Sequence, residues 1–410
     1  MARLIKDQII ASIDIGTTKI CVLIARKIGD QLEIIGIGKS PSYGLKKGVV
    51  VDVAKTINSI NLAVKEAEMM AGVPIEGAYI GISGGHVSAV NSTGVVPIKH
   101  GQIKQADVDA VLEAAKAIAI PEGRQILHTL PQYFIINGCD RVQDPIGMHG
   151  VRLEVQAHII MGSVSSVQNL VNCCQSAGVN VNDIILEQLA SADAVLSEDE
   201  RELGVGVIDI GGGTSDVAFY KNGSVRHTMV LPVAGNHVTN DIAIGLRIMK
   251  SEAERIKKRY GFAIGNLVET EELIEVELMQ GEDLQVVRLS DLVLIIESRM
   301  RELFTLINED IVTHHLQQFM TNGIVLTGGG SLLTGARELA EEIFDCPVRI
   351  GKPRVLFDLV ETLQSPLYAT GYGLLMYVLQ NEKKIKMHLA EEPLTRRVFE
   401  RMKSWVSDFF

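Results

Sequence analysis

The sequence predicts an α/β fold with mixed sheets, built from two related halves. Strand-like segments alternate with helical segments along the whole chain, which is the pattern of α/β proteins. The segment IDIGTTKI at Ile13–Ile20 returns much later as IDIGGGTSDV at Ile208–Val217, which indicates an internal duplication at the scale of a domain. The chain has 410 residues, more than one ordinary hydrophobic core needs, so at least two domains are expected.

The first half is expected to open with a β-hairpin over 9–25, in which two apolar strands flank a Gly-Thr-Thr turn. An amphipathic helix over Val53–Ala71 should stop at Gly72-Val73-Pro74, because glycine and proline end helices. Strands are expected on both sides of this helix, at 32–37 and 78–83. A small α+β module then follows from Gly84-Gly85 to Gly162-Ser163, with strands at 126–136 and 151–160 and a helix at 108–118. The chain resumes with a helix at 164–176 and a strand at 181–186.

The second half repeats the hairpin at 208–217. Two helical stretches are expected within 231–268, followed by strands with a polar face and a long helix over 292–318. A strand, a triple-glycine turn and a helix are then predicted over 323–344. The last helix of the fold is predicted over 365–380, and the charged segment 381–393 is interpreted as a linker.

Composition excludes several classes of protein. The formal net charge of −11 argues against a nucleic-acid-binding protein, which would need a basic surface. The five cysteines contain no CxxC pair and are interpreted as reduced thiols. The N-terminal segment lacks the features of a signal peptide, and no stretch approaches the roughly 20 apolar residues of a membrane span. We therefore expect a cytoplasmic protein.

The two repeated turns are suited to binding a polyphosphate. Glycines let backbone N–H groups approach an anion closely and direct several donors at it. Thr17, Thr18 and Thr214 add hydroxyl donors, and Lys19 adds a cation for the terminal phosphates. Two such turns that face each other across a cleft would hold the phosphates from both sides.

A magnesium ion completes this predicted site. Asp14 and Asp209 precede the two turns and would hold Mg²⁺ through water, because Mg²⁺ dehydrates reluctantly and bridges carboxylates to phosphates. The glycine turn of LTGGGS offers bare backbone for the base or ribose of a nucleotide. The predicted nucleotide-binding residues are Asp14, Gly16, Thr17, Thr18, Lys19, Asp209, Gly211, Gly212, Gly213, Thr214, Gly235, Asn236, Gly328, Gly329, Gly330 and Ser331.

Each of these turns taken alone is compatible with an ordinary surface turn, and an aspartate at a strand end is usually a cap. Three glycine turns in order, two of them copies, favour a binding site. The chain contains no GxxxxGK[ST] phosphate loop, and no GxGxxG follows an early strand, so neither of these nucleotide motifs offers another interpretation.

The segments IDIGTTKI, VIDIGGGTSDV and IVLTGGGSLLTG resemble the two phosphate motifs and the adenosine motif of the actin, Hsp70 and sugar-kinase superfamily. Three further segments, GGHVSAVNSTGVV, LASADAVL and ATGYGLL, are similar to those of the FtsA family of bacterial cell-division actin homologues. The similarity extends over essentially the whole chain. It implies an actin-like fold of duplicated ATPase domains with an inserted α+β subdomain, and ATP with Mg²⁺ as cofactors.

The resemblance also implies a division into subdomains. Subdomain 1A would comprise 1–83, 162–196 and 363–386, and subdomain 2A would comprise 197–229 and 306–362. Subdomain 1C, of the SHS2 type, falls on the module at 84–161, and subdomain 2B on 230–305. A linker at 387–394 and an amphipathic helix at 395–410 complete the chain.

Two further features of the expected site rest on the family pattern. Glu254 and Lys257 fit a pair that contributes to the adenine pocket, although an ordinary surface ion pair one helical turn apart explains them equally well. Glu187 lies where relatives position the attacking water, but it could equally be a structural residue that caps the following helix. The family usually has proline next, where this chain has Gln188. We predict tight nucleotide binding with weak or absent ATPase activity, and the nucleotide as a ligand for conformation and assembly.

The C-terminal segment TRRVFERMKSWVSDFF is predicted to form an amphipathic helix that lies in a membrane interface. At about 100° per residue its apolar side chains fall in one arc of roughly 140°. This arc contains Val398, Phe399, Met402, Trp405, Val406, Phe409 and Phe410, and the basic residues expected to meet anionic lipid are Arg396, Arg397, Arg401 and Lys403. The alternative is a helix docked on the core of the protein or on a partner.

By resemblance the chain would polymerise, tether FtsZ filaments of the division ring to the inner face of the membrane, and recruit later division proteins through subdomain 1C. Arg299 and Arg301 are candidates for contact with the acidic C-terminal tail of FtsZ; a solvated helix face is the alternative. Two other functions stay open: a small-molecule kinase of the same superfamily, and an actin homologue of pilus assembly. For the kinase we find neither a substrate pocket nor a catalytic base.

Overall fold

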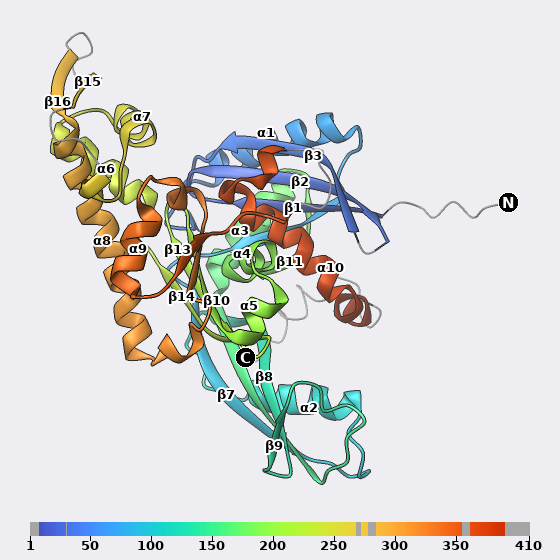
Figure 1. The fold of residues 1–410 in the computed structure, drawn as a ribbon. Coiled ribbons are helices and arrows are strands. Elements are labelled where there is room, and N and C mark those ends of the chain that lie inside the picture. Colours follow the sequence, from blue (N-terminus) through green and yellow to red (C-terminus); the bar gives the residue numbers. More distant parts are fainter. Residues whose placement is uncertain (1–7, 30, 268–271, 278–283, 355–360, 390–410) are drawn as a thin grey trace.

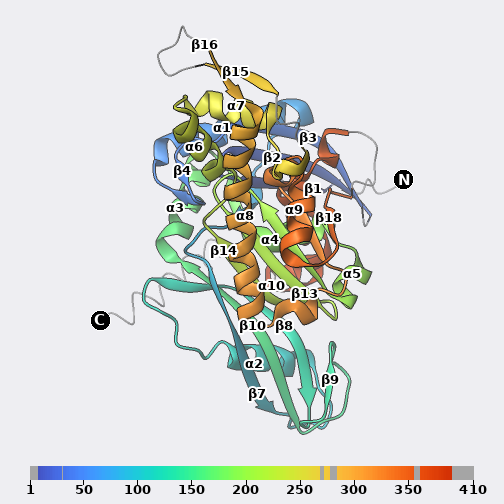
Figure 2. The ribbon, with the colours of Figure 1, turned by 60° about the vertical axis from the view of Figure 1, so that its left-hand side comes forward.

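The computed structural model describes residues 8–29, 31–267, 272–277, 284–354 and 361–389. Two α/β bodies lie side by side, and a narrower module projects from one end of the molecule (Figure 1 and Figure 2). Each α/β body is built around one five-stranded sheet.

The first sheet has the strand order β11-β6-β1-β2-β3. Strands β1, β2 and β3 form an antiparallel meander, and β6 and β11 add to β1 as parallel strands. The predicted first hairpin is therefore confirmed. The bounds are β1 Gln8–Ile15, β2 Lys19–Ile28, β3 Gln31–Pro41, β6 Gly77–Ile82 and β11 Asn180–Leu186, with a small hairpin of β4 Leu45–Lys46 and β5 Val49–Val50.

The second sheet has the order β14-β13-β12-β17-β18 and repeats the first strand for strand. Again three strands form an antiparallel meander, and two parallel strands follow on the other side of the first. The bounds are β12 Val205–Ile210, β13 Ser215–Lys221, β14 Ser224–Leu231, β17 Ile324–Thr327 and β18 Val348–Ile350. The predicted duplication is confirmed, because two copies of one topology carry the two IDIG segments.

The helices follow the same repeat. Helices α1 (Val53–Ala71) and α8 (Leu289–Thr313) each precede the fourth strand of their sheet, and α3 (Val164–Ser176) and α9 (Ala336–Phe344) precede the fifth. Helix α1 packs on β2 and β3 through Ile60, Ala63 and Ala67, which are all fully buried. Helix α8 ends before the predicted Gln318, because His315 adopts a left-handed conformation that stops the helix. Helix α4 (Glu187–Val195), α5 (Glu198–Leu203) and α10 (Ala369–Leu389) connect the two halves.

Two insertions interrupt the halves at non-equivalent points. The module predicted from the sequence lies between β6 and α3, and its four-stranded sheet has the order β7-β10-β8-β9. Its elements are β7 Ser88–Pro97, α2 Gln105–Ala115, β8 Arg124–Ile136, β9 Asp140–Val142 and β10 Arg152–Ser163. The other insertion lies between β14 and α8 and consists of α6 Gly235–Leu246, α7 Lys250–Tyr260, β15 Leu273–Glu277 and β16 Leu284–Arg288. The module has a hydrophobic core of its own, distinct from the core of either half.

At the C-terminal end the prediction that a linker begins at Asn381 is wrong. Helix α10 continues to Leu389, because the segment after Tyr377 contains good helix formers and the next proline is Pro393. The rest of the predicted linker and the whole predicted helix at 395–410 lie outside the described residues. Among the helices that the structure describes, none has the length and apolar character needed to cross a bilayer.

Candidate functional site

The two glycine turns meet at the junction of the two halves. They close in the same way: Gly16 N–H donates to Lys19 O at 3.1 Å, and Gly211 N–H donates to Thr214 O at 2.9 Å. A Cβ on Gly212 would overlap the side chain of Thr18, and one on Gly213 would overlap that of Thr17. Glycine is therefore what allows the turns to approach each other so closely.

Helix α6 begins on the second turn. Gly235 N–H donates to Gly211 O at 3.1 Å, and Asn236 N–H donates to Gly212 O at 2.8 Å. The side chain of Asn236 reaches across to the first turn, where its Oδ1 accepts from Thr18 Oγ1 at 3.3 Å. The structure thus gathers residues of both turns, Gly235 and Asn236 at one place, and their role in binding stays a prediction.

Four carboxylates from different elements converge beside these turns. Asp14 and Asp209 are the last residues but one of β1 and β12, Asp216 is the second residue of β13, and Glu187 is the first residue of α4. The three aspartates are buried and Glu187 is half-buried. Asp209 and Asp216 are directly opposed in the β12–β13 hairpin, so their side chains lie on the same face of the sheet.

Burial raises the pKa of all four carboxyl groups. It raises the pKa of Asp14 to about 6, against the opposing effect of the Lys19 ammonium. Burial raises the pKa of Asp216 to about 7 and that of Asp209 above its ordinary value. The pKa of Glu187 is raised well above its ordinary range, first by burial and then by the charge of Asp216. Carboxylates held this close repel one another and need protons or a cation.

This donor set suits a magnesium ion. Several carboxylates and hydroxyls around one buried position are the oxygen ligands that Mg²⁺ prefers, directly or through water. Lys19 supplies positive charge to the same carboxylates and is itself held in place. Its ammonium donates to Leu367 O at 2.6 Å and lies 4.6 Å from the centre of the Tyr368 ring.

Hydroxyl groups fix the carboxylates and link the halves. Asp209 accepts hydrogen bonds from Ser191 and from Thr370, the latter at 3.0 Å. Asp216 accepts a hydrogen bond from Ser83, which lies on the other half of the molecule. Ser83 also lies 3.4 Å from the hydroxyl of Thr214. The carboxylate cluster is therefore held from both halves at once.

The third glycine turn lies directly against this cluster. Gly328 has a φ of 77°, and a Cβ there would overlap the carboxylate of Asp209. A Cβ on Gly330 would overlap Ile210, and one on Gly329 would lie 2.9 Å from Leu367. Gly329–Leu332 form a short 3-10 helix, and Ser331 donates to Gly328 O at 2.7 Å. At 328 and 330, then, glycine is needed for packing on β12, besides the predicted contact with a nucleotide.

Glu254 and Lys257 form an ion pair of 2.7 Å on α7, and both side chains are largely buried. Lys257 also donates to Gly235 O at 3.2 Å and to Thr239 Oγ1 at 2.9 Å. Burial lowers the pKa of Lys257, although the Glu254 carboxylate works in the opposite direction. This pair is therefore no ordinary surface ion pair, because it holds α7 against the first turn of α6, next to the second glycine turn.

Glu187 is the first residue of α4, and its side chain crosses Gly81 of β6. A Cβ on Gly81 would lie 3.0 Å from Glu187 Cγ. The residue before it, Leu186, makes no side-chain capping bond. Glu187 thus belongs both to the first turn of a helix and to the carboxylate cluster, and its role in positioning water stays a prediction.

Sequence reasoning missed one carboxylate of the cluster, Asp216, and three hydroxyl residues that bond to the cluster, Ser83, Ser191 and Thr370. Asp216 could have been found, because a hairpin that turns at Gly211–Thr214 places it opposite Asp209. Ser83 and Thr370 come from segments far away in the sequence, and no local pattern marks them. Ser191 follows Glu187 by one helical turn on α4, which could have pointed to it.

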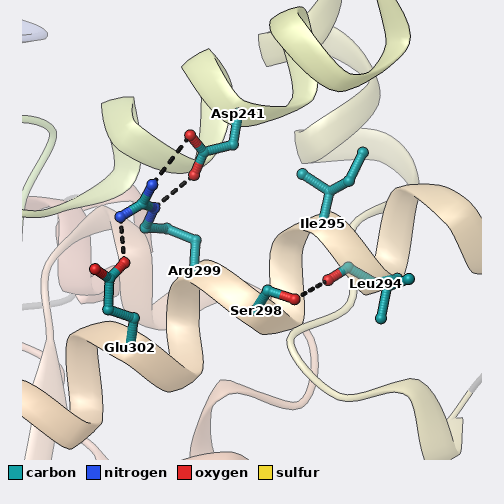
Figure 3. A pocket seen from close by; sticks show the side chains of 6 residues that line it. All are labelled: Asp241, Leu294, Ile295, Ser298, Arg299 and Glu302. Carbon is teal, nitrogen blue, oxygen red and sulfur yellow. Dashed lines mark hydrogen bonds and ion pairs between the residues drawn. The ribbon is translucent and has the colours of Figure 1, made fainter.

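The two arginines predicted to meet a partner lie differently on α8. Arg299 lines a cavity of about 400 Å³ between α6 and α8, together with Asp241, Leu294, Ile295, Ser298 and Glu302 (Figure 3). Its guanidinium is paired with Asp241 at 2.5 Å and with Glu302. Arg301 pairs instead with Glu297 at 2.9 Å and with Glu342 of α9 at 2.7 Å, and it does not line the cavity.

A second cavity of about 580 Å³ lies nearby on α6 and is lined by Asn240, Ala243, Ile244, Arg247, Ile248 and Lys250. Ile244 is 77% exposed and Leu294, at the first cavity, is 66% exposed. The surface around α6 and α8 therefore combines exposed apolar side chains with basic ones.

Comparison with known protein families gives two matches. The family model described as "Cell division protein FtsA" matches residues 206–373, and the model described as "SHS2 domain inserted in FTSA" matches residues 84–161. The second range coincides with the inserted module.

Curated relatives extend the similarity to the full chain. The cell division protein FtsA of Pseudomonas aeruginosa is 44% identical over 100% of this chain and 100% of its own length. FtsA of Escherichia coli K12 is 36% identical over 99% of this chain and 97% of its own length. FtsA of Bacillus subtilis is 36% identical over 95% of this chain and 88% of its own.

Solved structures with the same fold are more distant in sequence. A PilM-PilN type IV pilus biogenesis complex matches with a TM-score of 0.64 at 17% identity, covering 90% of this chain and 98% of that chain. MreB5 of Spiroplasma citri bound to ADP matches with a TM-score of 0.57 at 16% identity, covering 92% of this chain and 98% of that one. These likenesses show the actin-like fold and no more.

Proposed function

The chain belongs to the FtsA family and is an actin-like cell-division protein, and from this premise we propose that it binds ATP with Mg²⁺, polymerises, and attaches FtsZ to the membrane. The observation that carries nucleotide binding is the convergence of four carboxylates, Lys19 and three glycine turns where the duplicated halves meet. The kinase and the pilus-assembly alternatives are not favoured, because the full-length relatives are FtsA proteins.

In the proposed complex, Mg²⁺ would be held by Asp14 and Asp209 through water and would neutralise the phosphate charge. The backbone of the two turns, with Thr17, Thr18 and Thr214, would bind the phosphates, and Lys19 would be released from Leu367 O toward them. Glu254 and Lys257 support the adenine side through α6. We propose that turnover is slow, with Glu187 as the residue that would orient water.

Nucleotide binding can be tested by titrating the purified full chain with a fluorescent ATP analogue, with and without Mg²⁺. Asp209→Asn should weaken Mg²⁺-dependent binding at least about tenfold, which corresponds to roughly 1.4 kcal/mol. Glu187→Gln should leave the affinity within about threefold and remove the residual hydrolysis. Asp109→Asn, which changes an exposed carboxylate of α2 in the inserted module, serves as the control. Equal affinities for Asp209→Asn and the control would rule out the proposed site.

For the membrane, the proposal rests on the sequence of residues 395–410. Each tail should bind reversibly, because partly buried aromatic side chains contribute about 1–2 kcal/mol each and each basic residue about 1 kcal/mol near anionic lipid. A filament presents many tails, so assembly and membrane attachment should reinforce each other through avidity.

The test is co-sedimentation with anionic liposomes in the presence of ATP. The full chain should pellet with the vesicles, and a chain that ends at residue 394 should stay in the supernatant. Trp405→Glu, which places a charge in the apolar arc, should behave like the truncation, and Ser404→Glu on the polar face should retain most binding. If the full chain does not pellet, the tether is excluded.

For FtsZ, we propose that the surface between α6 and α8 binds its acidic C-terminal tail. The exposed side chains of Ile244 and Leu294 would meet apolar residues of the tail, and Arg247, Lys250 and Arg299 would meet its charges. Arg301 is less suited, because it is paired away from the cavity. Fluorescence anisotropy with a labelled tail peptide should show binding lost in Leu294→Glu and retained in Arg301→Ala. The reverse result would place the tail elsewhere.

A further inference from the structure

Two histidines and an aspartate meet at the end of α8 that lies farthest from the α6 cavity. His227 comes from β14, Asp310 from the last turn of α8, and His314 is the residue that caps the C-terminal end of this helix. Asp310 Oδ2 is 2.8 Å from His227 Nε2, and Asp310 Oδ1 is 3.0 Å from His314 Nδ1. The three potential ligand atoms all lie within 4.8 Å of one another. We propose that these residues form a binding site for a divalent transition-metal ion, with Zn²⁺ the best match.

The backbone prepares this arrangement. Asp310 and His314 are four residues apart on one helix and so lie on the same face. His227 lies on the edge strand of the second sheet, and its ring is 4.6 Å from that of His314, centre to centre. The site is at the C-terminal end of a helix of 25 residues, where the last carbonyl groups favour a cation.

The chemistry of the donors fits zinc. Two imidazole nitrogens and one carboxylate oxygen are ligands that Zn²⁺ accepts, with water in the remaining position. At Zn–N and Zn–O distances of about 2.0–2.2 Å, tetrahedral ligand atoms lie roughly 3.3–3.6 Å apart, so the present positions need to move by only about an ångström. An N₂O set of this kind is unsuited to Mg²⁺, which prefers oxygen ligands.

The side chains of the site are exposed enough for an ion to reach them, and one ring nitrogen has to give up its proton to the other when the ion binds. The His314 side chain is 49% exposed, and those of His227 and Asp310 are 18% and 19% exposed. His314 Nδ1 lies 3.1 Å from the backbone oxygen of Asp310 as well as near its carboxylate, which indicates that Nδ1 carries the proton in the metal-free protein. Metal binding at Nδ1 would move this proton to Nε2.

The site lies where the inserted module rests on the second half. The neighbours of His227 along β14 make this contact: Thr228 bonds His158 of β10 at 2.9 Å, and Arg226 O accepts from Gln132 of β8 at 3.1 Å. Figure 2 shows that the C-terminal end of α8 points toward the module. A bound ion would link α8 to β14, the strand on which the inserted module packs. It would thereby stabilise the contact between the module and the second half.

The test uses the full chain, with Mg²⁺ present to occupy the carboxylate cluster, and Co²⁺ as a spectroscopic probe. We expect visible absorption bands typical of tetrahedral cobalt, saturation at one ion per chain, and their loss on addition of Zn²⁺. Zn²⁺ should also raise the melting temperature, because it binds the folded state.

His314→Gln and His227→Gln should abolish the bands and weaken Zn²⁺ binding at least about tenfold. His315→Gln changes the adjacent exposed histidine and should leave both unchanged. His314→Gln decides the result if His227→Gln fails to fold, since the His314 side chain is half exposed. The proposal is overturned if the wild type shows no bands and no thermal shift, or if His314→Gln binds as the wild type does.

Discussion

At the scale of single residues, His158 is a buried titratable side chain that lies outside the carboxylate cluster. It is buried on β10 of the inserted module, at the contact with β14, where Nδ1 bonds Asn91 at 2.7 Å and Nε2 bonds Thr228 at 2.9 Å. Burial lowers its pKa to about 3, with a smaller effect in the same direction from nearby His227. The folded protein therefore keeps this imidazole neutral.

Low pH should consequently destabilise the contact between the inserted module and β14. The unfolded chain protonates this histidine near pH 6.5, whereas the folded chain does so only near pH 3. Between these values the unfolded state binds more protons, so stability is complete above about pH 6.5 and falls as the pH decreases toward 3. We expect a slope of up to about 1.4 kcal/mol per pH unit from this one group.

The measurement is urea unfolding of wild type and His158→Gln from pH 7 to pH 4. Glutamine can keep a hydrogen bond but does not titrate, so the variant should lose less stability on acidification. Parallel curves for the two proteins would show that His158 is not the source of the pH dependence. His100→Gln, at an exposed position of the module, controls for the loss of an ordinary histidine.

At the scale of elements, the crossing of α4 and α10 joins the two halves. The helices pack closely, and Gly373 is what permits this, because a Cβ there would overlap the carbonyl group of Ala190. Two residues earlier, a Cβ on Gly371 would meet Leu23 Cδ1 at 3.5 Å, an ordinary contact. One helix thus carries a glycine required by packing and another that packing does not require.

Alanine substitutions in α10 should therefore have different effects. Gly373→Ala forces the helices apart and should destabilise the protein by about 1–3 kcal/mol. Gly371→Ala removes a flexible residue from a helix without a clash and should be neutral or stabilising by up to about 1 kcal/mol. Chemical denaturation measures both. Similar losses of stability in the two variants would contradict a specific close contact at Gly373.

The sequence was sufficient to predict those elements whose ends carry local signals. Helix α1 has the predicted bounds, because Asp52 caps its start and Gly72 adopts a left-handed conformation at its end. The sequence predicts an end of α8 several residues beyond the observed one. The helix ends before His315, which has a left-handed conformation, and histidine is not a residue type that usually marks the end of a helix. The same holds for the site: the repeated turns are visible in the sequence, whereas Ser83 and Thr370 reach the cluster only through tertiary packing.

At the scale of the whole molecule, the duplication has an electrostatic consequence. Each half carries an aspartate near the end of its first strand, and joining the halves places both beside Asp216 and Glu187. Without a cation these carboxylates repel one another across the junction. The junction should therefore be weak in the ligand-free protein and strong when Mg²⁺ and nucleotide are bound.

Asp216→Asn should reverse this balance. Asparagine has the same shape and can still accept from Ser83, but it removes one of the four carboxyl groups that can carry negative charge. We expect the ligand-free protein to gain on the order of 1–3 kcal/mol in stability. The rise in melting temperature on addition of Mg²⁺ and ATP should shrink, because a charge that attracts the cation is gone.

Differential scanning calorimetry of wild type, Asp216→Asn and the control Asp109→Asn separates the two effects. The control should leave both the ligand-free melting temperature and the ligand-induced rise unchanged, since Asp109 is exposed on α2 of the inserted module. A variant that is less stable without ligand would show that Asp216 is needed for packing and not for cation binding. If the ligand-free melting temperature of Asp216→Asn rises while the ligand-induced rise becomes smaller, the carboxylates repel one another in the ligand-free protein and the ligand relieves this repulsion. The nucleotide state then controls the stability of the junction between the two halves.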